Sequence, residues 1–408
     1  MRVGINGYFL REPWTGMGNH LTQLTLALDA RDAGDERYSL LVPRFPGDAL
    51  TSRPPGGQSG RLSQTTRAAL DRLPRRFSAV EQGVGPQRVP VQLAKLWWEM
   101  VGVVVAGRRA RIDLLHSPYW TNPLWSPWPT VVTVHDVIQL VLPEYRALAR
   151  QRVYFGLVTR TLRKATAIIT VSECSRRDLI RTVGIPEDRV FAIENAIPAS
   201  LQPVTDPARL QAVRARYDLD ERFILYLGAN DLRKNLNRLI RAYAALPQAL
   251  RDTHQLVVAG RQWPHDHPLY PDPKLVVREL GLEGRVVFLG GIPEEEKATL
   301  MSAATVFAFP AIYEGFGLPV LEAMACGTPV LTSNTSSLPE VAGDAAIQVD
   351  PTNVEAIRDG LATLLESPDR RTRLAARGIE RASRFRWSEV AERTLRVYER
   401  AIRGATAR

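Results

Sequence analysis

Two glutamates in a glycine-rich segment carry the strongest chemical signal in the chain. Glu314 and Glu322 enclose the residues Gly-Phe-Gly-Leu-Pro-Val-Leu, and Ala-Met-Ala-Cys-Gly-Thr-Pro-Val follows. Gly315 and Gly317 let the backbone approach a ligand closely, and Pro319 suits the first turn of a helix, whose N–H groups bind anions. Two carboxylates beside an anion site suit a diphosphate-linked sugar. The alternative is an ordinary strand–turn–helix with two solvated glutamates.

A pair of cations, Arg233 and Lys234, follows the expected strand 223–227 and opens an expected helix. Cationic side chains beside a helix start neutralise a bound diphosphate and stabilise it as a leaving group. Taken alone, the pair is equally well explained as solvated charges at a helix start.

His135 and Asp136 stand at the end of the expected strand 130–134. Strand ends of open α/β sheets line the ligand crevice, so the pair is a site candidate in which Asp136 orients the His135 ring. A purely structural role is the alternative. Gly16 and Gly18 lie between the first strand and the first helix, but their spacing is not that of a dinucleotide-binding loop.

These residues are set in an alternation of short β-branched runs and longer segments of helical period, which is typical of parallel-sheet α/β domains. The expected strands are 2–6, 38–42, 112–116, 130–134, 167–171 and 189–193, then 223–227, 255–259, 285–289, 306–309, 329–332 and 345–349. A proline-containing stretch without a strong strand, 194–220, predicts a domain junction. Residues 1–200 then form the N-terminal domain, 201–385 the C-terminal domain and 386–408 a closing helix.

A basic segment at about 48–111 interrupts the first domain. Residues 51–111 contain eleven Lys/Arg against three acids, together with Trp97 and Trp98. The sequence offers no strand there, so we expect a loop or helical insertion on the surface. Its charge suggests docking at anionic lipid, with the two tryptophans at the interface. A solvated loop with packed tryptophans is the alternative.

Composition and charge limit the class of protein. The 408 residues suit two or three domains, and 45% hydrophobic with 24% charged residues is ordinary for a folded soluble protein. Two cysteines, Cys174 and Cys326, favour a reducing compartment, which we take to be the cytoplasm. Residues 1–200 carry 26 Lys/Arg against 17 Asp/Glu, net +9, and the remainder carries 27 against 26, net +1. The basic half suits an anionic partner, but no motif supports nucleic acid.

The chain resembles glycosyltransferase family 4, whose signature is two glutamates separated by seven residues, as at Glu314 and Glu322. The resemblance implies retaining enzymes with the GT-B fold: two Rossmann-like doubly wound parallel-sheet α/β domains with an interdomain cleft, and a last helix that crosses back to the N-terminal domain. Catalytic roles fall to His135, Glu314, Arg233 and Lys234. The implied donor-binding residues are Gly16, Gly18, Arg233, Lys234, Glu314, Gly315, Phe316, Gly317, Leu318 and Glu322. Many members have Arg where this chain has Ala229.

The resemblance also implies the reaction. A hexosyl group would pass to a glycan or a polyprenyl-diphosphate-linked acceptor. The motif segments most resemble those of mannosyltransferases, so we expect mannose from GDP-mannose. A UDP-sugar donor is the alternative. Residues expected on the acceptor side are His116, Tyr119, Trp120, Asn122 and Asp136. We expect no metal and no cofactor beyond the nucleotide sugar, because Asp218-Leu-Asp220 is more typical of a helix cap or a turn than of a metal site. We also expect a cytoplasmic enzyme at the inner face of the membrane. A nucleic-acid-binding protein and an inactive GT-B partner subunit are the alternatives from other classes.

Overall fold

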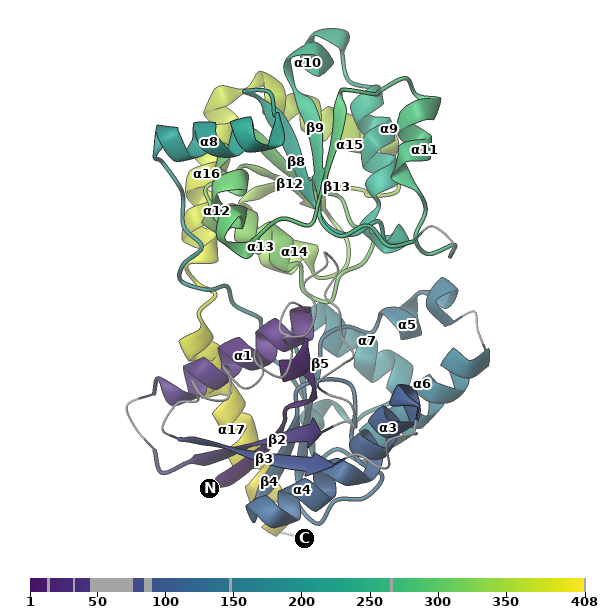
Figure 1. Ribbon diagram of the computed structural model, residues 1–408, viewed down its shortest axis with the longest axis vertical. Helices are drawn as coiled ribbons and strands as arrows, with labels where there is room; N and C mark the ends of the chain where they lie inside the picture. Colours follow the sequence, from purple (N-terminus) through teal and green to yellow (C-terminus); the bar gives the residue numbers. More distant parts are fainter. Residues whose placement is uncertain are drawn as a thin grey trace. The chain divides into compact units, whose positions relative to one another are not determined.

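The computed structural model of the protein describes residues 1–12, 15–31, 34–44, 76–83, 90–146, 149–264 and 267–406. The chain divides into two compact units. Unit 1 contains Met1–Val171, Ser175–Asn195 and Trp387–Arg408, and unit 2 contains Ser172–Cys174 and Ala196–Arg386. Each unit has its own parallel sheet with helices packed on it, which confirms the predicted α/β class (Figure 1).

The sheet of unit 1 has seven parallel strands in the order β3-β2-β1-β4-β5-β6-β7. They are β1 (Arg2–Asn6), β2 (Arg37–Arg44), β3 (Phe77–Gly83), β4 (Leu114–Ser117), β5 (Thr130–Val134), β6 (Ala167–Thr170) and β7 (Val190–Ala192). Strand β5, with the sequence Thr-Val-Val-Thr-Val, is buried along its whole length. Such apolar β-branched runs form inner strands of parallel sheets, because helices cover both faces. The strand order reverses between β1 and β4, which makes this point the topological switch of unit 1.

Helices pack along this sheet. The helical elements of unit 1 are η1 (Tyr8–Arg11), α1 (Gly16–Asp29), α3 (Val91–Trp97), η2 (Trp98–Gly102), α4 (Val103–Ala110), α5 (Ile138–Val141), η3 (Pro143–Arg146), α6 (Ala149–Leu162), α7 (Glu173–Val183), η4 (Glu187–Arg189) and α17 (Trp387–Thr406). Figure 1 shows α17, the end of the chain, lying beside α1, and it also contacts β5 and β6. The C-terminal helix is thus a structural part of unit 1.

The basic segment differs from the sequence-based expectation. Residues 77–83 form β3, the edge strand that pairs with β2, so the prediction of no strand in this segment is wrong. Strand β3 lacks a clear alternation of apolar and polar residues because most of this edge strand is exposed; only Phe77 is buried. Residues 45–75 and 84–89, with the turn-rich start of the segment, lie outside the described residues.

The sheet of unit 2 has six parallel strands in the order β10-β9-β8-β11-β12-β13. They are β8 (Phe223–Leu227), β9 (Gln255–Ala259), β10 (Val286–Gly290), β11 (Val306–Phe309), β12 (Val330–Ser333) and β13 (Ala346–Val349). The order reverses between β8 and β11, the two strands that precede the predicted cation pair and the predicted glutamates.

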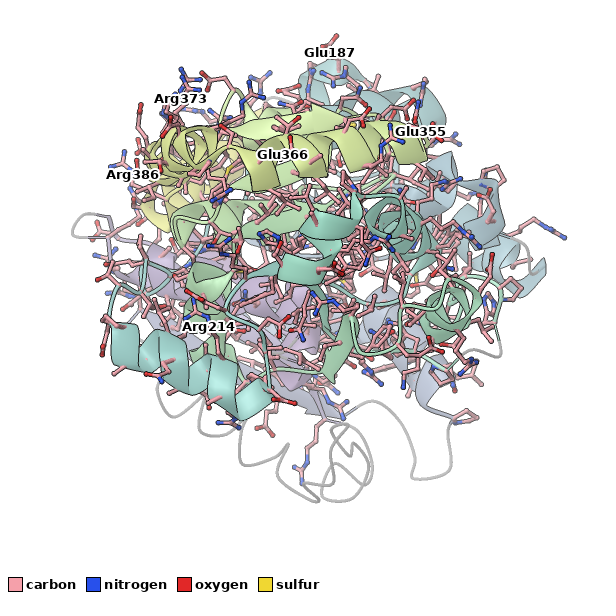
Figure 2. All side chains as sticks on the ribbon, turned by 90° about the horizontal axis from the view of Figure 1, so that it is seen from above. Glu187, Arg214, Glu355, Glu366, Arg373 and Arg386 are labelled. Atoms are coloured by element: carbon pink, nitrogen blue, oxygen red, sulfur yellow. The ribbon has the colours of Figure 1, made fainter. Side chains whose placement is uncertain are left out.

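Helices of unit 2 are α8 (Pro207–Tyr217), η5 (Leu232–Lys234), α9 (Leu236–Ala244), α10 (Gln248–Thr253), α11 (Pro273–Glu279), α12 (Glu294–Ala303), α13 (Leu318–Ala325), α14 (Leu338–Ala342), α15 (Val354–Glu366) and α16 (Pro368–Ala382). The outer faces of α15 and α16 carry exposed charges: Glu355, Glu366 and Arg373 point away from the ribbon (Figure 2). Among the described residues of either unit, no helix is both long and apolar enough to cross a bilayer.

Candidate active site

The candidate site of unit 2 is built where the sheet order reverses. Strand β8 leads into Arg233 and Lys234, and its neighbour β11 leads into Glu314. Because the carboxyl ends of parallel strands meet at one edge of the sheet, residues 79 positions apart come into contact: the Arg233 carbonyl accepts a hydrogen bond from the Ile312 amide at 2.7 Å. Topology alone therefore brings the two strongest sequence signals together.

Arg233 and Glu314 form an ion pair at this edge. Nη1 of Arg233 lies 2.7 Å from Oε1 of Glu314 and donates to the Tyr313 carbonyl at 3.1 Å. Both side chains are about one-seventh exposed, at 14% and 13%. Asp231 holds the turn, since its Oδ1 accepts from the Arg233 amide. A guanidinium has five N–H donors, so Arg233 retains the capacity to bind an anion while it contacts Glu314.

Lys234 is the second cation of the site. Its Nζ lies 5.7 Å from the centre of the Phe309 ring, the last residue of β11. Burial lowers the pKa of Lys234 below the ordinary value of 10.5, and the Glu314 carboxylate counteracts the shift. An ammonium that is partly desolvated in the free protein gains more from an incoming anion than one in bulk water does.

Glu322 is buried, with 7% of its surface exposed, and it pairs with a lysine that the sequence analysis did not single out. Nζ of Lys297, on α12, lies 2.9 Å from Oε1 of Glu322 and 2.7 Å from Oε1 of Glu294. Burial opposes the charge on Lys297, yet the two carboxylates raise the pKa of its ammonium. Burial also raises the pKa of the Glu322 carboxyl, against the pull of Lys297. The Glu-Glu-Glu-Lys sequence at the start of α12 was the only signal for this pair.

The backbone between the two glutamates turns sharply. Gly317 has a φ of 107° and precedes the first residue of α13, Leu318. A Cβ at Gly317 would lie 2.6 Å from Leu338, so both conformation and space require glycine. Glu322 is the fifth residue of α13 and lies beyond its first turn, whereas we had expected it within that turn, close to a bound anion. Its charge therefore lies one turn further from the exposed N–H groups of the helix start.

A second loop, which the sequence analysis missed, fixes this turn. The single O–H of Ser337 is shared between the carbonyls of Glu314 and Phe316, which lie 2.9 Å and 2.8 Å from its Oγ. The Thr335 hydroxyl donates to the Ile312 carbonyl. Ser336 has a φ of 56°, which is uncommon for a residue other than glycine. The hydroxyl-rich run after β12 was the available signal, because such side chains satisfy loop carbonyls.

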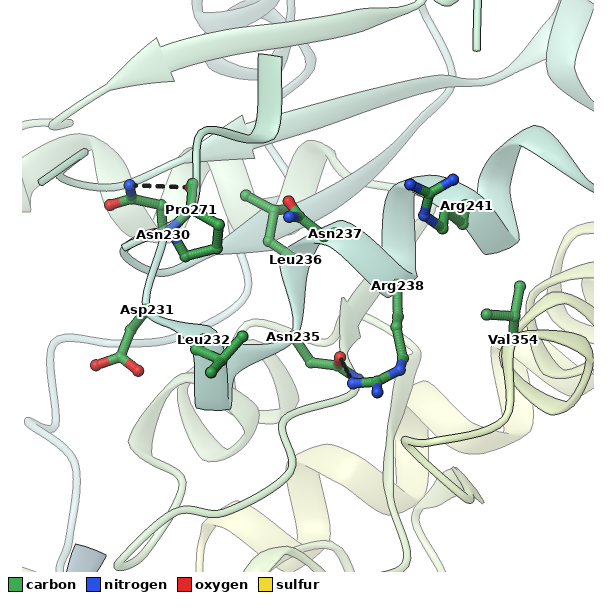
Figure 3. Close-up of a pocket in the computed structure, with 10 residues that line it drawn as sticks. All are labelled: Asn230, Asp231, Leu232, Asn235, Leu236, Asn237, Arg238, Arg241, Pro271 and Val354. Carbon is green, nitrogen blue, oxygen red and sulfur yellow. Dashed lines mark hydrogen bonds between the residues drawn. The ribbon is translucent and has the colours of Figure 1, made fainter. Parts of the chain in front are cut away.

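A pocket of about 330 Å³ lies beside this cluster on α9 (Figure 3). It is lined by Asn230, Asp231, Leu232, Asn235, Leu236, Asn237, Arg238, Arg241, Pro271 and Val354. Asn235 donates to the carbonyls of Pro310 and Pro351 and accepts from Arg238, so it ties the start of α9 to the ends of β11 and β13. Arg233, Lys234, Glu314 and Glu322 are not among the lining residues.

Unit 1 places His135 at the carboxyl end of β5. Its Nε2 lies 2.9 Å from the Pro118 carbonyl, and burial lowers its pKa to about 4. A carbonyl only accepts hydrogen bonds, so Nε2 carries the proton and Nδ1 is an acceptor. The ring of His20, from α1, meets that of His135 edge-on at 4.7 Å, and its Nδ1 contacts Asn195 at 2.8 Å. The sequence did not point to His20. Oδ1 of Asp136 accepts a hydrogen bond from the amide of Ile138, the first residue of α5.

Burial argues against three predicted acceptor contacts. His116, Tyr119 and Asn122 are 0%, 3% and 3% exposed. His116 uses Nε2 for Thr133 and Nδ1 for the Tyr398 hydroxyl of α17, and burial lowers its pKa to about 3. Tyr119 accepts from Asn6 and Asn122 donates to Thr161. These side chains hold the interior of unit 1 together, so they have no surface to offer an acceptor. The Trp120 ring lies 6.1 Å from that of Phe155 in an edge-on contact.

The two glycines before α1 have different surroundings. Gly18 is buried, and a Cβ there would lie 2.1 Å from the Glu12 carbonyl, so packing explains the glycine. Its amide donates to Thr15, the N-cap of α1. Gly16 is the exposed first residue of that helix, with open space around it. A donor contact at Gly16 stays a prediction.

A buried carboxyl near the end of β1 was also missed by the sequence analysis. Glu99 is 1% exposed on the π-helical turn η2, where Lys95 Nζ is 3.7 Å away. Burial raises the pKa of Glu99 to about 7. Its neighbour Trp98 is fully buried and donates to Asn6 at 3.0 Å, so the prediction that Trp98 sits at a lipid interface is wrong.

The pair of aspartates weighed as a metal motif has a structural role. Asp218 is the C-cap of α8 with a φ of 52°, and Asp220 accepts from Arg285 at 3.0 Å. This agrees with the predicted capping or turn role. In the part of the chain that the structure describes, no group of three or more His, Cys, Asp or Glu is arranged to hold a metal ion.

Two family profiles match the two halves of the chain. The family described as Glycosyltransferase Family 4 matches residues 14–201, and that described as Glycosyl transferases group 1 matches residues 211–381. O-antigen chain mannosyltransferase B of Escherichia coli is 37% identical over 270 residues, which are 66% of this chain and 70% of that protein. MMP alpha-(1->4)-mannosyltransferase of Mycolicibacterium hassiacum is 31% identical over 318 residues, 73% of each chain.

The fold also has relatives of solved structure. Sucrose-phosphate synthase from Thermosynechococcus elongatus superposes with a TM-score of 0.73 at 23% identity, over 99% of this chain and 100% of the other. That likeness concerns the GT-B fold alone. Together with the matches over both halves and the identity to the Escherichia coli protein, it leads to one conclusion: the chain is an enzyme of glycosyltransferase family 4.

Proposed function

We propose that this glycosyltransferase transfers mannose, with retention at the anomeric carbon, from GDP-mannose to a glycan or a polyprenyl-diphosphate-linked acceptor. Two of its relatives that are at least 30% identical are named mannosyltransferases. One observation in unit 2 supports donor binding above all. Arg233 and Lys234 lie at the same sheet edge as Glu314, with Arg233 only 2.7 Å from that carboxylate.

The edge suits a diphosphate that becomes a leaving group. Negative charge develops on the diphosphate as the glycosidic bond breaks, and two cations with the N–H groups of residues 315–318 stabilise it. Burial lowers the pKa of Lys234 in the free protein, and an incoming anion favours the charged form that burial disfavours, which supports this assignment. We assign the acceptance of the acceptor proton to the diphosphate.

The carboxylates and His135 are assigned to the sugar and ribose. Carboxylate oxygens only accept hydrogen bonds, which suits hydroxyl groups, so Glu314 is assigned to the mannose and Glu322 to the ribose. Lys297 occupies one oxygen of Glu322 and leaves the other for the ligand. Nδ1 of neutral His135 is assigned to a hydroxyl of the donor sugar.

The finer setting of the enzyme is part of the proposal. We place it in the cytoplasm, at the inner face of the membrane, where a polyprenyl-linked acceptor is available. The net charge of +9 over residues 1–200 supports an anionic surface as partner. We propose that no metal is needed, because Arg233 and Lys234 supply the positive charge that a divalent cation supplies at other diphosphate sites.

Donor turnover tests the proposal. Purified protein is incubated with GDP-mannose, GDP-fucose, UDP-glucose and UDP-galactose in the presence of chelator, and nucleotide release is measured. GDP-mannose should be preferred. Lys234→Ala and Glu314→Gln should each lower kcat/KM about 10²–10³-fold, because they remove contacts to the charge that develops in the transition state. Arg373→Ala, at an exposed position on α16 (Figure 2), is the matched control and should keep full turnover.

Other results would redirect the assignment. A preference for a UDP-hexose would replace the donor while keeping the site. No turnover of any nucleotide sugar by a protein that unfolds cooperatively would instead favour an inactive partner subunit. Full activity of Lys234→Ala would remove the diphosphate site from this edge.

A further inference from the structure

A groove of about 1030 Å³ opens at the edge of the unit 1 sheet opposite His135. Its lining includes the first residues of two strands, Thr130 of β5 and Ala167 of β6, and Arg400 near the end of α17. These are amino ends of parallel strands, whereas His135 follows a carboxyl end. The groove is therefore separate from the expected donor and acceptor edge of this unit.

The loop between β4 and β5 exposes two adjacent apolar side chains beside this groove. Leu124 is 47% exposed and Trp125 is 59% exposed. The Arg108 guanidinium, from the last turn of α4, lies 5.3 Å from the centre of the Trp125 ring. Exposing a leucine and a tryptophan side by side is unfavourable in water, so the pair indicates a partner that covers it.

The loop is held in place on both sides. A Cβ at Gly107 of α4 would lie 3.0 Å from the Trp128 ring, so this ring packs directly on the glycine. Lys164, just after α6, donates to the Leu124 carbonyl at 3.2 Å. Ser126 donates to the Trp128 carbonyl at 2.9 Å. Leu124 and Trp125 are thus presented by a fixed loop, which lowers the entropy lost on binding.

Cations surround the pair. Arg108 and Lys164 flank the loop, Arg400 lies over the Phe191 ring at 5.1 Å, and Asp188 is the one acid among the groove residues. Cations at helix C-termini are common because they complement the helix dipole, so charge alone decides little. An exposed tryptophan and leucine enclosed by cations is a more specific combination, since tryptophan and arginine favour the interface of anionic bilayers.

We propose that this surface, formed by Leu124, Trp125, Arg108, Lys164 and Arg400, docks the enzyme on an anionic phospholipid bilayer. Leu124 and Trp125 enter the headgroup region, and the cations contact lipid phosphates. Of the two tryptophans of the expected interface, Trp98 is buried, whereas Trp97 is 38% exposed and its place at a lipid surface stays a prediction. The proposed docking surface deepens the proposed function by naming the residues that would contact the anionic membrane, and it rests on that function for the need to approach a membrane-bound acceptor.

The orientation has a consequence for unit 1. Contact through the amino ends of β5 and β6 turns the carboxyl end of β5, with His135, away from the lipid. A short acceptor lying flat on the bilayer could not reach that edge, whereas the far end of a growing glycan could. The surface therefore selects acceptors by their distance from the membrane.

Vesicle sedimentation tests the surface. The full chain is mixed with vesicles of phosphatidylcholine alone or with about a third phosphatidylglycerol. We expect binding to the anionic vesicles only. Trp125→Ala should weaken it about tenfold and Arg108→Glu at least about tenfold. Matched controls are Leu275→Ser, which changes a side chain 57% exposed on α11, and Arg373→Glu on α16; both should bind like the unaltered protein (Figure 2).

The outcomes are distinguishable from a failure of the proposed function. Turnover of GDP-mannose without vesicles should be unchanged in Trp125→Ala, so loss of binding with kept turnover supports the surface. Equal binding to neutral vesicles, or equal losses in the two controls, overturns it. A last experiment adds soluble mannose oligosaccharides and measures tryptophan fluorescence. Quenching in the unaltered chain but not in Trp125→Phe would show that the groove binds a glycan, and it would overturn the lipid proposal.

Discussion

In both units the carboxyl ends of parallel strands form a candidate site, but charged side chains line it in unit 2 and neutral histidines line it in unit 1. At the reversal point of unit 2, ionised groups are paired: Arg233 with Glu314, and Lys297 with Glu322. At the corresponding end of unit 1, burial lowers the pKa values of three imidazoles, those of His20, His116 and His135, so they are neutral near pH 7. Unit 1 also buries the Glu99 carboxyl, whose pKa burial raises to about 7.

The difference reflects what each edge has to hold. A diphosphate carries charge that changes during the reaction, and fixed charges stabilise it without reorganisation. Hydroxyl groups carry no charge, and neutral imidazoles donate and accept hydrogen bonds without the desolvation penalty of an ion. The comparison predicts that unit 2 is sensitive to the loss of a charge and unit 1 to the gain of one.

The largest effect should follow from breaking the buried pair of unit 2. Lys297→Met keeps the apolar stem but leaves Glu322 buried without its cation, so we expect a loss of about 3–5 kcal/mol in the free energy of unfolding. Urea unfolding with hydrogen exchange at β11 measures it. The double variant Lys297→Met/Glu322→Leu should recover much of the loss, because no uncompensated charge remains. Equal destabilisation by the single and double variants would show that packing, and not charge, is responsible.

A smaller effect should follow from charging unit 1. His116 and His135 have pKa values of about 3 and about 4, below the ordinary 6.5. As the pH falls below 6.5, the unfolded chain takes up protons that the folded chain does not, so stability falls. From pH 6.5 to pH 5 the loss is about 2 kcal/mol for each imidazole. Glu99, with its pKa raised to about 7, acts in the opposite direction and offsets part of the loss.

Hydrogen exchange resolves this effect by unit. Amides of β4 and β5 should lose protection at pH 5, while those of β8 and β11 keep theirs. In His116→Gln, which cannot take up the proton, the acid-dependent loss should shrink by the share of one imidazole. An equal loss of hydrogen-exchange protection in both sheets at pH 5 would contradict the prediction that acid destabilises unit 1 and not unit 2.

The sequence predicted those parts of the molecule that depend on local pattern. The apolar β-branched runs at 2–6, 130–134 and 223–227 are strands with those bounds, because a buried parallel strand leaves a continuous apolar signal. Strand β3 was missed because an edge strand at the surface needs no such run. Element type was thus predictable where burial was complete and not where it was partial.

For the site, prediction succeeded for residues in distinctive segments and failed for their partners. Glu314 and Arg233 stand in recognisable segments, and the sheet topology brings them together. Lys297 lies on another helix, so only tertiary packing reveals its contact with Glu322. His116 was predicted to be a site residue because a histidine in a strand looks available for a ligand. Its Nδ1 is in fact hydrogen-bonded to the Tyr398 hydroxyl, 282 residues away in the chain, and no local pattern indicates that contact.

A still smaller effect concerns Lys234. Its lowered pKa means that it loses its proton at a lower pH than an ordinary lysine, so KM for the donor should rise as the pH is raised through the alkaline range. Loss of one charged contact should raise KM about tenfold. Lys234→Arg stays charged and should show a flat profile. A rise of the same size in Lys234→Arg would assign the titration to another group.

The smallest effect should come from an ion pair of unit 2 that lies in water. Arg241 and Glu279 form two hydrogen bonds of 3.0 Å and 2.9 Å, geometrically as good as the contact between Lys297 and Glu322, but their side chains are 41% and 56% exposed. Solvent and salt screen such a pair, so Arg241→Ala should leave the urea midpoint within experimental error, and added salt should not change this result. Arg241→Ala could instead destabilise unit 2 as much as Lys297→Met does. The free energy of unfolding would then depend on the number of ion pairs and not on their burial, and the contrast between the charged site of unit 2 and the neutral histidines of unit 1 would lose its physical basis.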